Sequence, residues 1–122
     1  MKILIIDDED DIRRISRLAL ERVGGMVVVD AASGVEGIAM AVADAPDAIL
    51  LDVMMPEKDG PETFGLLKAD PRTAGIPVIF LTAKAMASEV DRLRALGAKG
   101  VLTKPFDPMS LAANVRAILG SE

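Results

Sequence analysis

Short apolar runs alternate along the chain with segments of helical periodicity. Five runs, at residues 3–6, 26–29, 48–51, 78–81 and 101–102, lack the polar and apolar alternation of a half-exposed strand. Uninterrupted aliphatic runs of this kind are typical of strands buried on both faces of a parallel sheet. We therefore predict five parallel strands.

The segments between these runs carry the spacing and the end signals of helices. In the first of them, Ile12, Ile15, Ala19 and Val23 recur at steps of three or four residues, which predicts a stripe facing the core. The predicted end signals are Asp10 as N-cap, a capping box at 33–36, Pro71 after a helix at about 61–69, a capping pattern at 88–91 before a stop at Gly97, and Asp107 as N-cap before Pro108.

Five strands alternating with five helices predict an α/β fold of the (βα)5 doubly wound, flavodoxin-like class. In this class a five-stranded parallel sheet has helices on both faces, and we expect the strand order 2-1-3-4-5. The crossovers are expected to be right-handed. The 122 residues suit one domain over 1–122, without an effector domain.

Composition removes several classes of function. The chain has no cysteine and no histidine, which rules out thiolate nucleophiles and imidazole bases. Its formal net charge is −5 and it has no run of Lys and Arg, so we expect no direct binding of nucleic acid. The apolar N-terminus is too short for a membrane span, and a cytoplasmic location is the expectation.

Polar residues follow four of the predicted strands directly. Asp7 and Asp8 come after the first strand, Asp52 after the third, Thr82 after the fourth, and Thr103-Lys104 after the fifth. The carboxyl ends of parallel strands share one edge of the sheet, and ligands bind there in doubly wound folds. These side chains are therefore predicted to converge on one pocket.

Such a pocket suits phosphoryl transfer. Three crowded carboxylates repel one another unless a cation lies among them, and carboxylates with open water positions suit Mg²⁺. Lys104 would add a second positive charge, so Asp52 could stay ionised and act as a nucleophile toward phosphorus. Thr82 would donate a hydrogen bond, and this chemistry needs little beyond positioning and charge neutralisation.

The motifs at these positions resemble those of the receiver domains of two-component response regulators, CheY-like proteins. The motifs are Ile5-Ile6-Asp7-Asp8-Glu9, Leu50-Leu51-Asp52-Val53-Met54-Met55-Pro56, Asp59-Gly60, Leu81-Thr82-Ala83 and Leu102-Thr103-Lys104-Pro105-Phe106. They occur in the family's order over the whole chain. The resemblance implies a phosphoprotein, a signalling switch rather than an enzyme, although such a domain can assist its own phosphorylation and dephosphorylation.

The resemblance also assigns partners and a cofactor. It implies that Asp52 accepts a phosphoryl group from a sensor histidine kinase or a histidine phosphotransfer protein, as part of a phosphorelay. Asp7, Asp8 and Asp52, with the backbone carbonyl of Met54, would bind Mg²⁺. The downstream protein target is unknown, and phosphorylation is expected to allow a homodimer.

Two further site features come from the same resemblance. Thr82 and Lys104 would contact the phosphoryl oxygens, and a cis peptide is expected between Lys104 and Pro105, since X-Pro bonds adopt cis at low cost. Many receivers have an aromatic residue three positions before the lysine, where this chain has Val101. A bulky rotamer switch is therefore absent at that position.

Activation is expected to change the surface made by the fourth helix, the fifth strand and the fifth helix. We predict that the loop 83–88 and the helix after it move when Asp52 gains about −1.5 to −2 charges. The residues expected on this surface are Val90, Arg94, Val101 and Ala112.

Two other functions remain open from the sequence. A degenerate receiver would act only as a docking module, but its expected mark, loss of an acidic residue, Thr82 or Lys104, is missing. A haloacid-dehalogenase-like phosphatase also uses an aspartyl phosphate, and Asp8-Glu9-Asp10-Asp11-Ile12 approaches its signature. Ile12 breaks the last position of that signature, which weighs against this enzyme.

Overall fold

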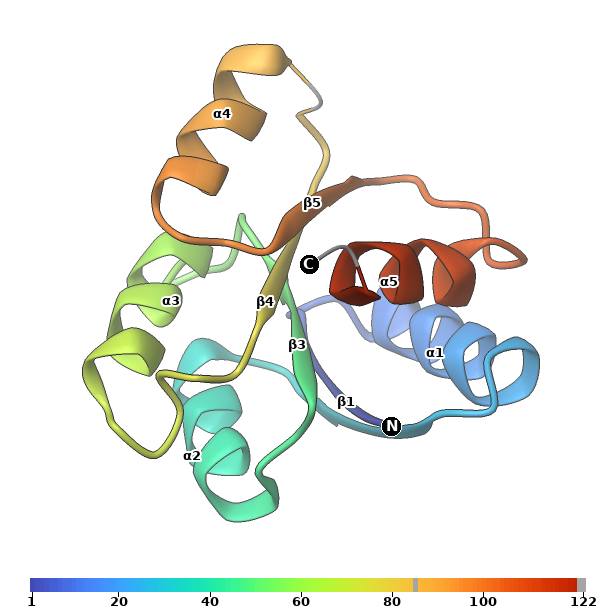
Figure 1. The fold of residues 1–122 in the computed structure, drawn as a ribbon, viewed down its shortest axis with the longest axis horizontal. Helices are drawn as coiled ribbons and strands as arrows, with labels where there is room; N and C mark the ends of the chain where they lie inside the picture. The colour runs from blue at the N-terminus through green and yellow to red at the C-terminus, as the bar shows by residue number, and fades with distance from the viewer. Residues whose placement is uncertain (85, 121–122) are drawn as a thin grey trace.

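One sheet of five parallel strands forms the centre of the computed structural model, which describes residues 1–84 and 86–120. The strands are β1 (Lys2–Ile6), β2 (Val27–Ala31), β3 (Ala48–Asp52), β4 (Val78–Thr82) and β5 (Gly100–Thr103). Their order in the sheet is β2-β1-β3-β4-β5 (Figure 1), which confirms the predicted doubly wound fold. Only the second strand differs clearly from its predicted range.

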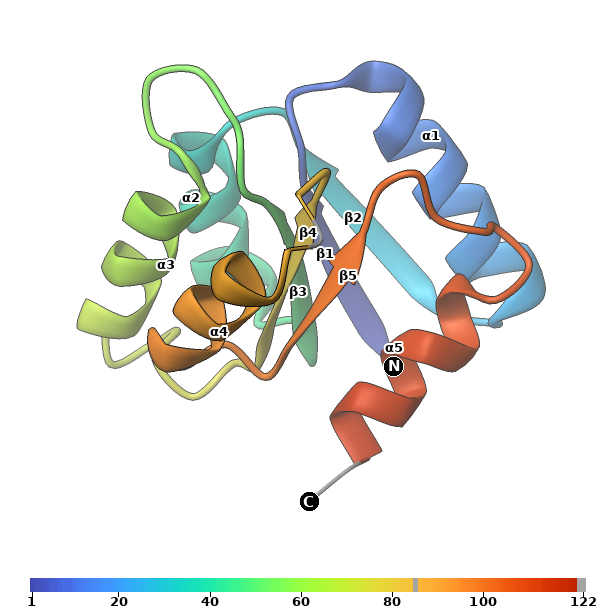
Figure 2. The same cartoon turned by 90° about the horizontal axis from the view of Figure 1, so that it is seen from above.

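Helices cover both faces of this sheet (Figures 1 and 2). They are α1 (Asp10–Leu18), which continues as the π-helix η1 (Ala19–Val23), α2 (Gly34–Asp44), α3 (Gly60–Ala69), α4 (Ala87–Ala95) and α5 (Leu111–Gly120). Buried residues of η1 and α5 pack on one face, and those of α2, α3 and α4 pack on the other. The sheet thus separates the core into two apolar layers.

Strand β1 shows why its sequence has no polar alternation. Ile3 and Ile5 enter one core layer, Leu4 and Ile6 enter the other, and all four are fully buried. Each such side chain contributes roughly 1.5–3 kcal/mol relative to an exposed position. A polar residue on either face of this strand would be buried without a partner.

The predicted buried stripe of the first helix is right at Ala19 but wrong at two other positions. Ile15 and Val23 are exposed, whereas Ser16 and Leu20 are fully buried against the sheet. The helix widens to a π-helix at Ala19, where the Gly24 N–H donates to the Ala19 carbonyl, five residues back. This wider turn changes the spacing before Val23, whereas Ile15 lies ahead of it in the regular part of the helix.

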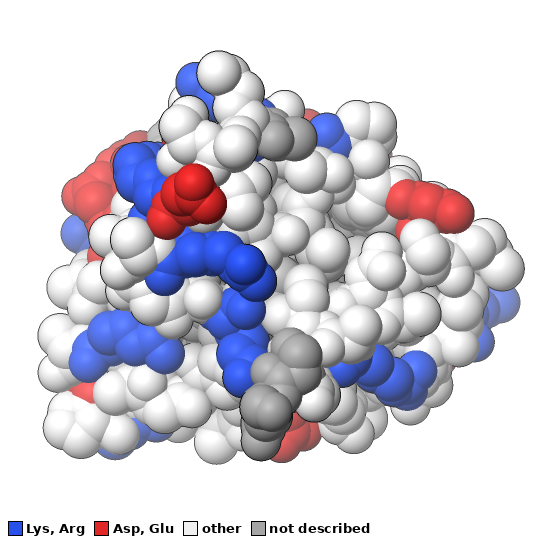
Figure 3. Space-filling view, turned by 45° about the horizontal axis from the view of Figure 1, so that its top comes forward, with Lys and Arg blue, Asp and Glu red and all other residues white. Residues whose placement is uncertain are grey.

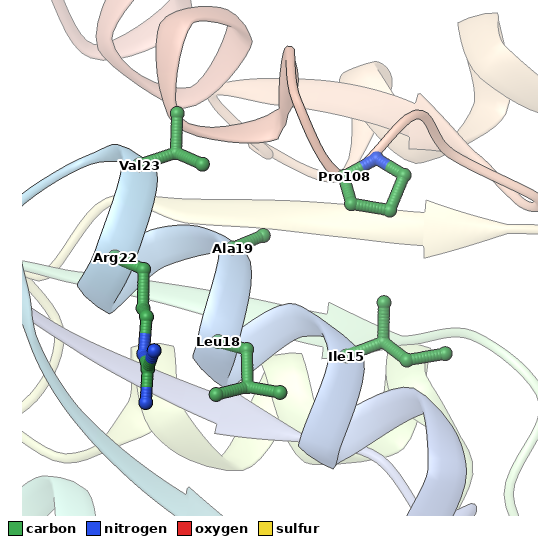
Figure 4. Close-up of a pocket in the computed structure, with 6 residues that line it drawn as sticks. All are labelled: Ile15, Leu18, Ala19, Arg22, Val23 and Pro108. Carbon is green, nitrogen blue, oxygen red and sulfur yellow. The ribbon is translucent and has the colours of Figure 1, made fainter.

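The displaced apolar residues form an open groove on the surface of α1 and η1 (Figure 4). Its volume is about 420 Å³. The lining residues are Ile15, Leu18, Ala19, Arg22, Val23 and Pro108. Pro108 follows β5, so the groove joins the segment after β1 to the segment after β5.

Three predicted helix starts are also wrong. Glu9 rather than Asp10 is the N-cap residue of α1, and α4 begins at Ala87 rather than after a cap at Ser88. Helix α5 begins at Leu111, because residues 108–110 form a turn in which the Asp107 carboxylate accepts from the Met109 N–H. Aspartate favours turns as well as caps, and the sequence signal is the same.

Two other helix starts have side-chain caps. The Ser33 hydroxyl accepts from the Glu36 N–H at 3.2 Å, as predicted for the start of α2. At α3 the capping box pairs Asp59 with Glu62 in both directions, and the sequence analysis did not identify it. Asp59 therefore fixes the beginning of the helix that follows β3.

Ala85, in the loop predicted to move, and residues 121–122 of the predicted single domain lie outside the described residues. Among residues 1–84 and 86–120, no helix has both the length and the apolar character that a bilayer crossing requires.

Two serines are expected to respond oppositely to replacement by alanine. The buried Ser16 Oγ has no hydrogen-bond partner among the described residues, so Ser16→Ala should raise the free energy of unfolding by about 1 kcal/mol. Ser33→Ala removes the cap of α2 and should lower the free energy of unfolding by about 1 kcal/mol. Urea unfolding followed by circular dichroism measures both, and a loss of stability in Ser16→Ala would contradict the first.

Candidate functional site

The carboxyl ends of β1, β3, β4 and β5 carry the predicted site residues at one end of the sheet (Figure 2). The register pairs Ile6 with Leu51 and Thr82 with Thr103, so the ends of neighbouring strands lie level. Asp7 and Lys104 each follow directly from such a strand. The structure therefore brings together side chains that are up to 97 positions apart in the sequence.

Four acidic side chains form a cluster at this edge. Each of Asp7, Asp8, Glu9 and Asp52 offers a carboxylate oxygen, and these oxygens lie within 4.8 Å of one another. Asp7 is fully buried and Asp52 is 3% exposed, whereas Asp8 and Glu9 are exposed. Oxygen ligands, some of them open to water, are the kind of set that Mg²⁺ prefers.

The Lys104 ammonium lies between the two buried carboxylates. Its Nζ is 2.8 Å from Asp7 Oδ2 and 3.1 Å from Asp52 Oδ1. Since the Lys104 side chain is only 12% exposed, solvent screens these pairs weakly. Removing Lys104 would leave two buried carboxylates without a compensating charge.

The pKa values of this group reflect burial and crowding. Burial and the charge of Asp7 raise the pKa of Asp52 to about 6, against the opposing charge and hydrogen bond of Lys104. Burial would lower the pKa of Lys104, but the hydrogen bond and charge of Asp7 and the charge of Asp52 outweigh it and raise that pKa. Without another cation, Asp52 is therefore costly to ionise.

Thr82 ends β4 as a buried residue beside this cluster. Its carbonyl accepts from the Lys104 N–H at 2.8 Å, which ties the lysine's backbone to β4. Its Oγ1 accepts from the Lys84 N–H at 3.0 Å. The hydroxyl proton is not used in that hydrogen bond, so it remains able to donate to a ligand.

Gly60 explains the Asp59-Gly60 motif. A Cβ at this position would lie 2.4 Å from the Asp52 carbonyl oxygen and 2.8 Å from Val53 Cα. The Gly60 N–H also donates to the Val53 carbonyl at 2.9 Å. Only glycine lets the start of α3 press this closely against the backbone of Asp52.

The other predicted positions have these surroundings. The Met54 side chain is 68% exposed, and its carbonyl stays a predicted metal ligand. The Lys104–Pro105 peptide is cis. Val101 is half-buried against the α2–α4 core layer. Ala112, predicted to lie on the output surface, is buried against η1 near Gly24, so that prediction is wrong.

Two residues contact the site although the sequence analysis did not assign them to it. Glu9 Oε1 lies 3.6 Å from Lys104 Nζ, and its place directly after Asp7-Asp8 was the available signal. The Arg13 guanidinium donates to the Asp7 carbonyl at 2.8 Å. No sequence pattern marks a contact between a side chain and a main-chain carbonyl six residues away.

The clustered carboxylates and their paired lysine lie at the carboxyl edge of the sheet, where doubly wound proteins bind ligands. The family model described as the response regulator receiver domain matches residues 3–116. The chain belongs to this family. Its members are signalling proteins of two-component systems rather than conventional enzymes.

Similar proteins agree with this assignment. The DNA-binding dual master transcriptional regulator RpaA of Synechocystis is 42% identical over 118 residues, which cover 97% of this chain and 48% of RpaA. The phosphate regulon transcriptional regulatory protein PhoB of Pseudomonas aeruginosa is 40% identical over 117 residues, covering 96% and 51%. The chain thus spans about half the length of these curated relatives.

The fold comparison gives the same family. The chemotaxis protein CheY4 of Vibrio cholerae superposes with a TM-score of 0.88 and is 31% identical, covering 96% of this chain and 97% of that one. A response regulator of Desulfuromonas acetoxidans has a TM-score of 0.88 at 29% identity, covering 98% and 96%. Each of these two superpositions covers nearly the whole of both chains.

Ionised Asp52 should destabilise the metal-free protein. Its folded pKa of about 6 exceeds the ordinary aspartate pKa of 3.8, so its contribution to stability is present below about pH 4 and is lost as the pH rises through 6. Asp52→Asn, which removes this charge, should therefore be more stable than wild type at pH 7.5 by on the order of 2 kcal/mol.

Urea unfolding with a chelator present, at pH 5 and pH 7.5, measures the difference between the two proteins. The advantage of Asp52→Asn should be small at the lower pH and should grow at the higher one. An advantage that is equal at both values would mean that the pKa of Asp52 is not raised.

Proposed function

We propose that this chain is a phosphorylation-activated switch in which Asp52 accepts a phosphoryl group from a sensor histidine kinase or a histidine phosphotransfer protein. The observation that carries the proposal is the buried Asp52 carboxylate, paired with Lys104 and beside Asp7 at the carboxyl edge of the sheet. An acceptor needs a nucleophile held among positive charges. In this arrangement the carboxylate is the nucleophile, and the paired ammonium is the first of the positive charges.

Mg²⁺ is the proposed cofactor, and the donor set fits it. Asp7, Asp8 and Asp52 would hold the ion, with the Met54 carbonyl as the predicted fourth ligand; their carboxylate oxygens lie within 4.8 Å of one another. When bound, the ion would neutralise negative charge on the transferring group. It would also compensate the mutual repulsion of Asp7 and Asp52, which raises the pKa of Asp52.

The chain's own residues then have distinct roles. An Asp52 carboxylate oxygen attacks phosphorus, forming an O–P bond as the N–P bond to the donor histidine breaks. The Lys104 ammonium, which already bridges Asp7 and Asp52, would contact one phosphoryl oxygen. The Thr82 hydroxyl, whose proton is not used in its bond with Lys84, would donate to another.

A donor protein has to reach Asp52 from outside the domain, so it needs a surface beside the site. The apolar groove of α1 and η1 is formed by the segment that follows Asp7-Asp8 and by Pro108, which follows Lys104 (Figure 4). Ile15, Leu18 and Val23 are exposed there. This groove is our proposed docking surface for the donor.

Output is proposed to pass through α4, β5 and α5. Residues 87–120, which contain these elements, have five basic and three acidic side chains although the whole chain has a net charge of −5. Figure 3 shows Lys and Arg gathered in a band on one face of the molecule. A phosphoryl group would add negative charge at the end of this region, drawing Thr82 and Lys104 toward it.

The competing functions fit the site less well. In the phosphatase signature the nucleophile would be Asp8, which is exposed, whereas the buried carboxylates paired with Lys104 are those of Asp7 and Asp52. A pure docking module would not need the acidic cluster, Thr82 and Lys104 together. The cytoplasmic location, the homodimer and the absence of direct nucleic-acid binding stay predictions.

Incubation with acetyl phosphate and Mg²⁺ should add one phosphoryl group to the wild-type protein. The adduct should be missing in Asp52→Asn and without Mg²⁺, because each removes part of the proposed acceptor site. Intact mass spectrometry measures the adduct directly. The phosphorylated protein should also show altered amide hydrogen exchange in the loop 83–88 and in α4.

An adduct that persists in Asp52→Asn would place the modification elsewhere and contradict the proposal. Continuous release of phosphate from generic phosphomonoesters would instead favour the phosphatase. An adduct without any change of amide exchange in α4 would leave Asp52 as the acceptor and make the proposed output route wrong.

A further inference from the structure

Arg13 connects the acidic loop to the helix that follows it. Its Nη1 donates to the Asp7 carbonyl at 2.8 Å, and its Nη2 contacts the Asp10 carboxylate. The loop between β1 and α1 consists of residues 7–9, so one guanidinium holds both of its ends. The Arg13 side chain is only 16% exposed and the Asp10 side chain 79%, so the bond to the Asp7 carbonyl is the better shielded of the two.

The polar groups of Asp7 are all engaged. Its N–H donates to the Ala31 carbonyl at 3.1 Å, which fixes it to β2. Its carboxylate accepts from the Glu9 N–H at 2.9 Å and from Lys104 Nζ at 2.8 Å. The bond from Arg13 to its carbonyl is therefore the contact that sets this residue relative to α1.

We propose that Arg13 is a positioning residue for the cation site, holding the loop so that the carboxylates of Asp7 and Asp8 are arranged for a divalent ion before it binds. This inference rests on the proposed function, because it concerns the same Mg²⁺ site. Residues that orient metal ligands through hydrogen bonds commonly change metal affinity 10- to 100-fold when they are replaced. Arg13 touches no phosphoryl group and is not a catalytic residue.

The direction of the effect separates positioning from simple charge. Arg13 is a positive charge beside a cation site, so removing it should strengthen Mg²⁺ binding if only Coulomb interactions matter. If Arg13 positions the loop, removing it should weaken Mg²⁺ binding instead. The two explanations predict opposite signs for one measured quantity.

Calorimetric titration with MgCl₂ of the wild-type chain and of Arg13→Gln, Arg13→Lys and Arg14→Gln tests the proposal. Arg14 is exposed and carries the same charge on the same helix, which makes it the matched control. Arg13→Gln should bind Mg²⁺ about tenfold more weakly. Arg13→Lys should be intermediate, because an ammonium can donate to the Asp7 carbonyl but lacks the fork that also reaches Asp10.

Mg²⁺ binding by Arg13→Gln as tight as wild type, or tighter, would overturn the inference and leave the proposed function intact. A wild-type chain that binds no Mg²⁺ would overturn both. If Arg13→Gln gives an unfolded NMR spectrum, the folded Arg13→Lys variant decides: weaker binding than Arg14→Gln supports the inference, and equal binding rejects it.

Discussion

The ion pairs of Lys104 with Asp7 and Asp52 are the interaction on which the site depends. Two carboxylates are buried at one edge of the sheet, and their repulsion is tolerable only with a cation between them. Burial and the charge of Asp7 raise the pKa of Asp52 against the opposing effect of Lys104, so a single ammonium does not offset the whole cost. The site therefore has less positive than negative charge. Binding of a divalent ion and a chemical change at Asp52 can each alter its charge balance strongly.

The rest of the fold holds these three side chains at one point. The parallel register brings the ends of β1, β3 and β5 level, so residues distant in sequence meet without long loops. Gly60 lets α3 begin directly against the backbone of Asp52, and Arg13 secures the loop that carries Asp7. Because the start of α3 packs directly against the backbone of Asp52, a charge change at Asp52 acts on an element in close contact with it.

The strands and the grouping of residues at their ends were predictable from the sequence, because buried parallel strands have no alternation and their carboxyl ends share an edge. The buried face of the first helix was predictable only in part. Ala19 is buried as expected, but Ile15 and Val23 line a groove, and the π-helical turn from Ala19 changes the spacing before Val23. The start of α5 was missed because Asp107 caps a turn rather than a helix. No sequence pattern indicated the role of Arg13 at the site, because its partner there is a main-chain carbonyl.

The central claim is that Asp52 is an acceptor that requires Mg²⁺. Fluorine NMR with beryllium fluoride tests it most directly, because this anion binds an ionised acceptor carboxylate as a stable mimic of the acyl phosphate and does not hydrolyse away. We predict a bound resonance for the wild-type chain with Mg²⁺, and none for Asp52→Asn or when Mg²⁺ is omitted. A wild-type chain without a bound resonance, or an Asp52→Asn variant that keeps one, would contradict the claim.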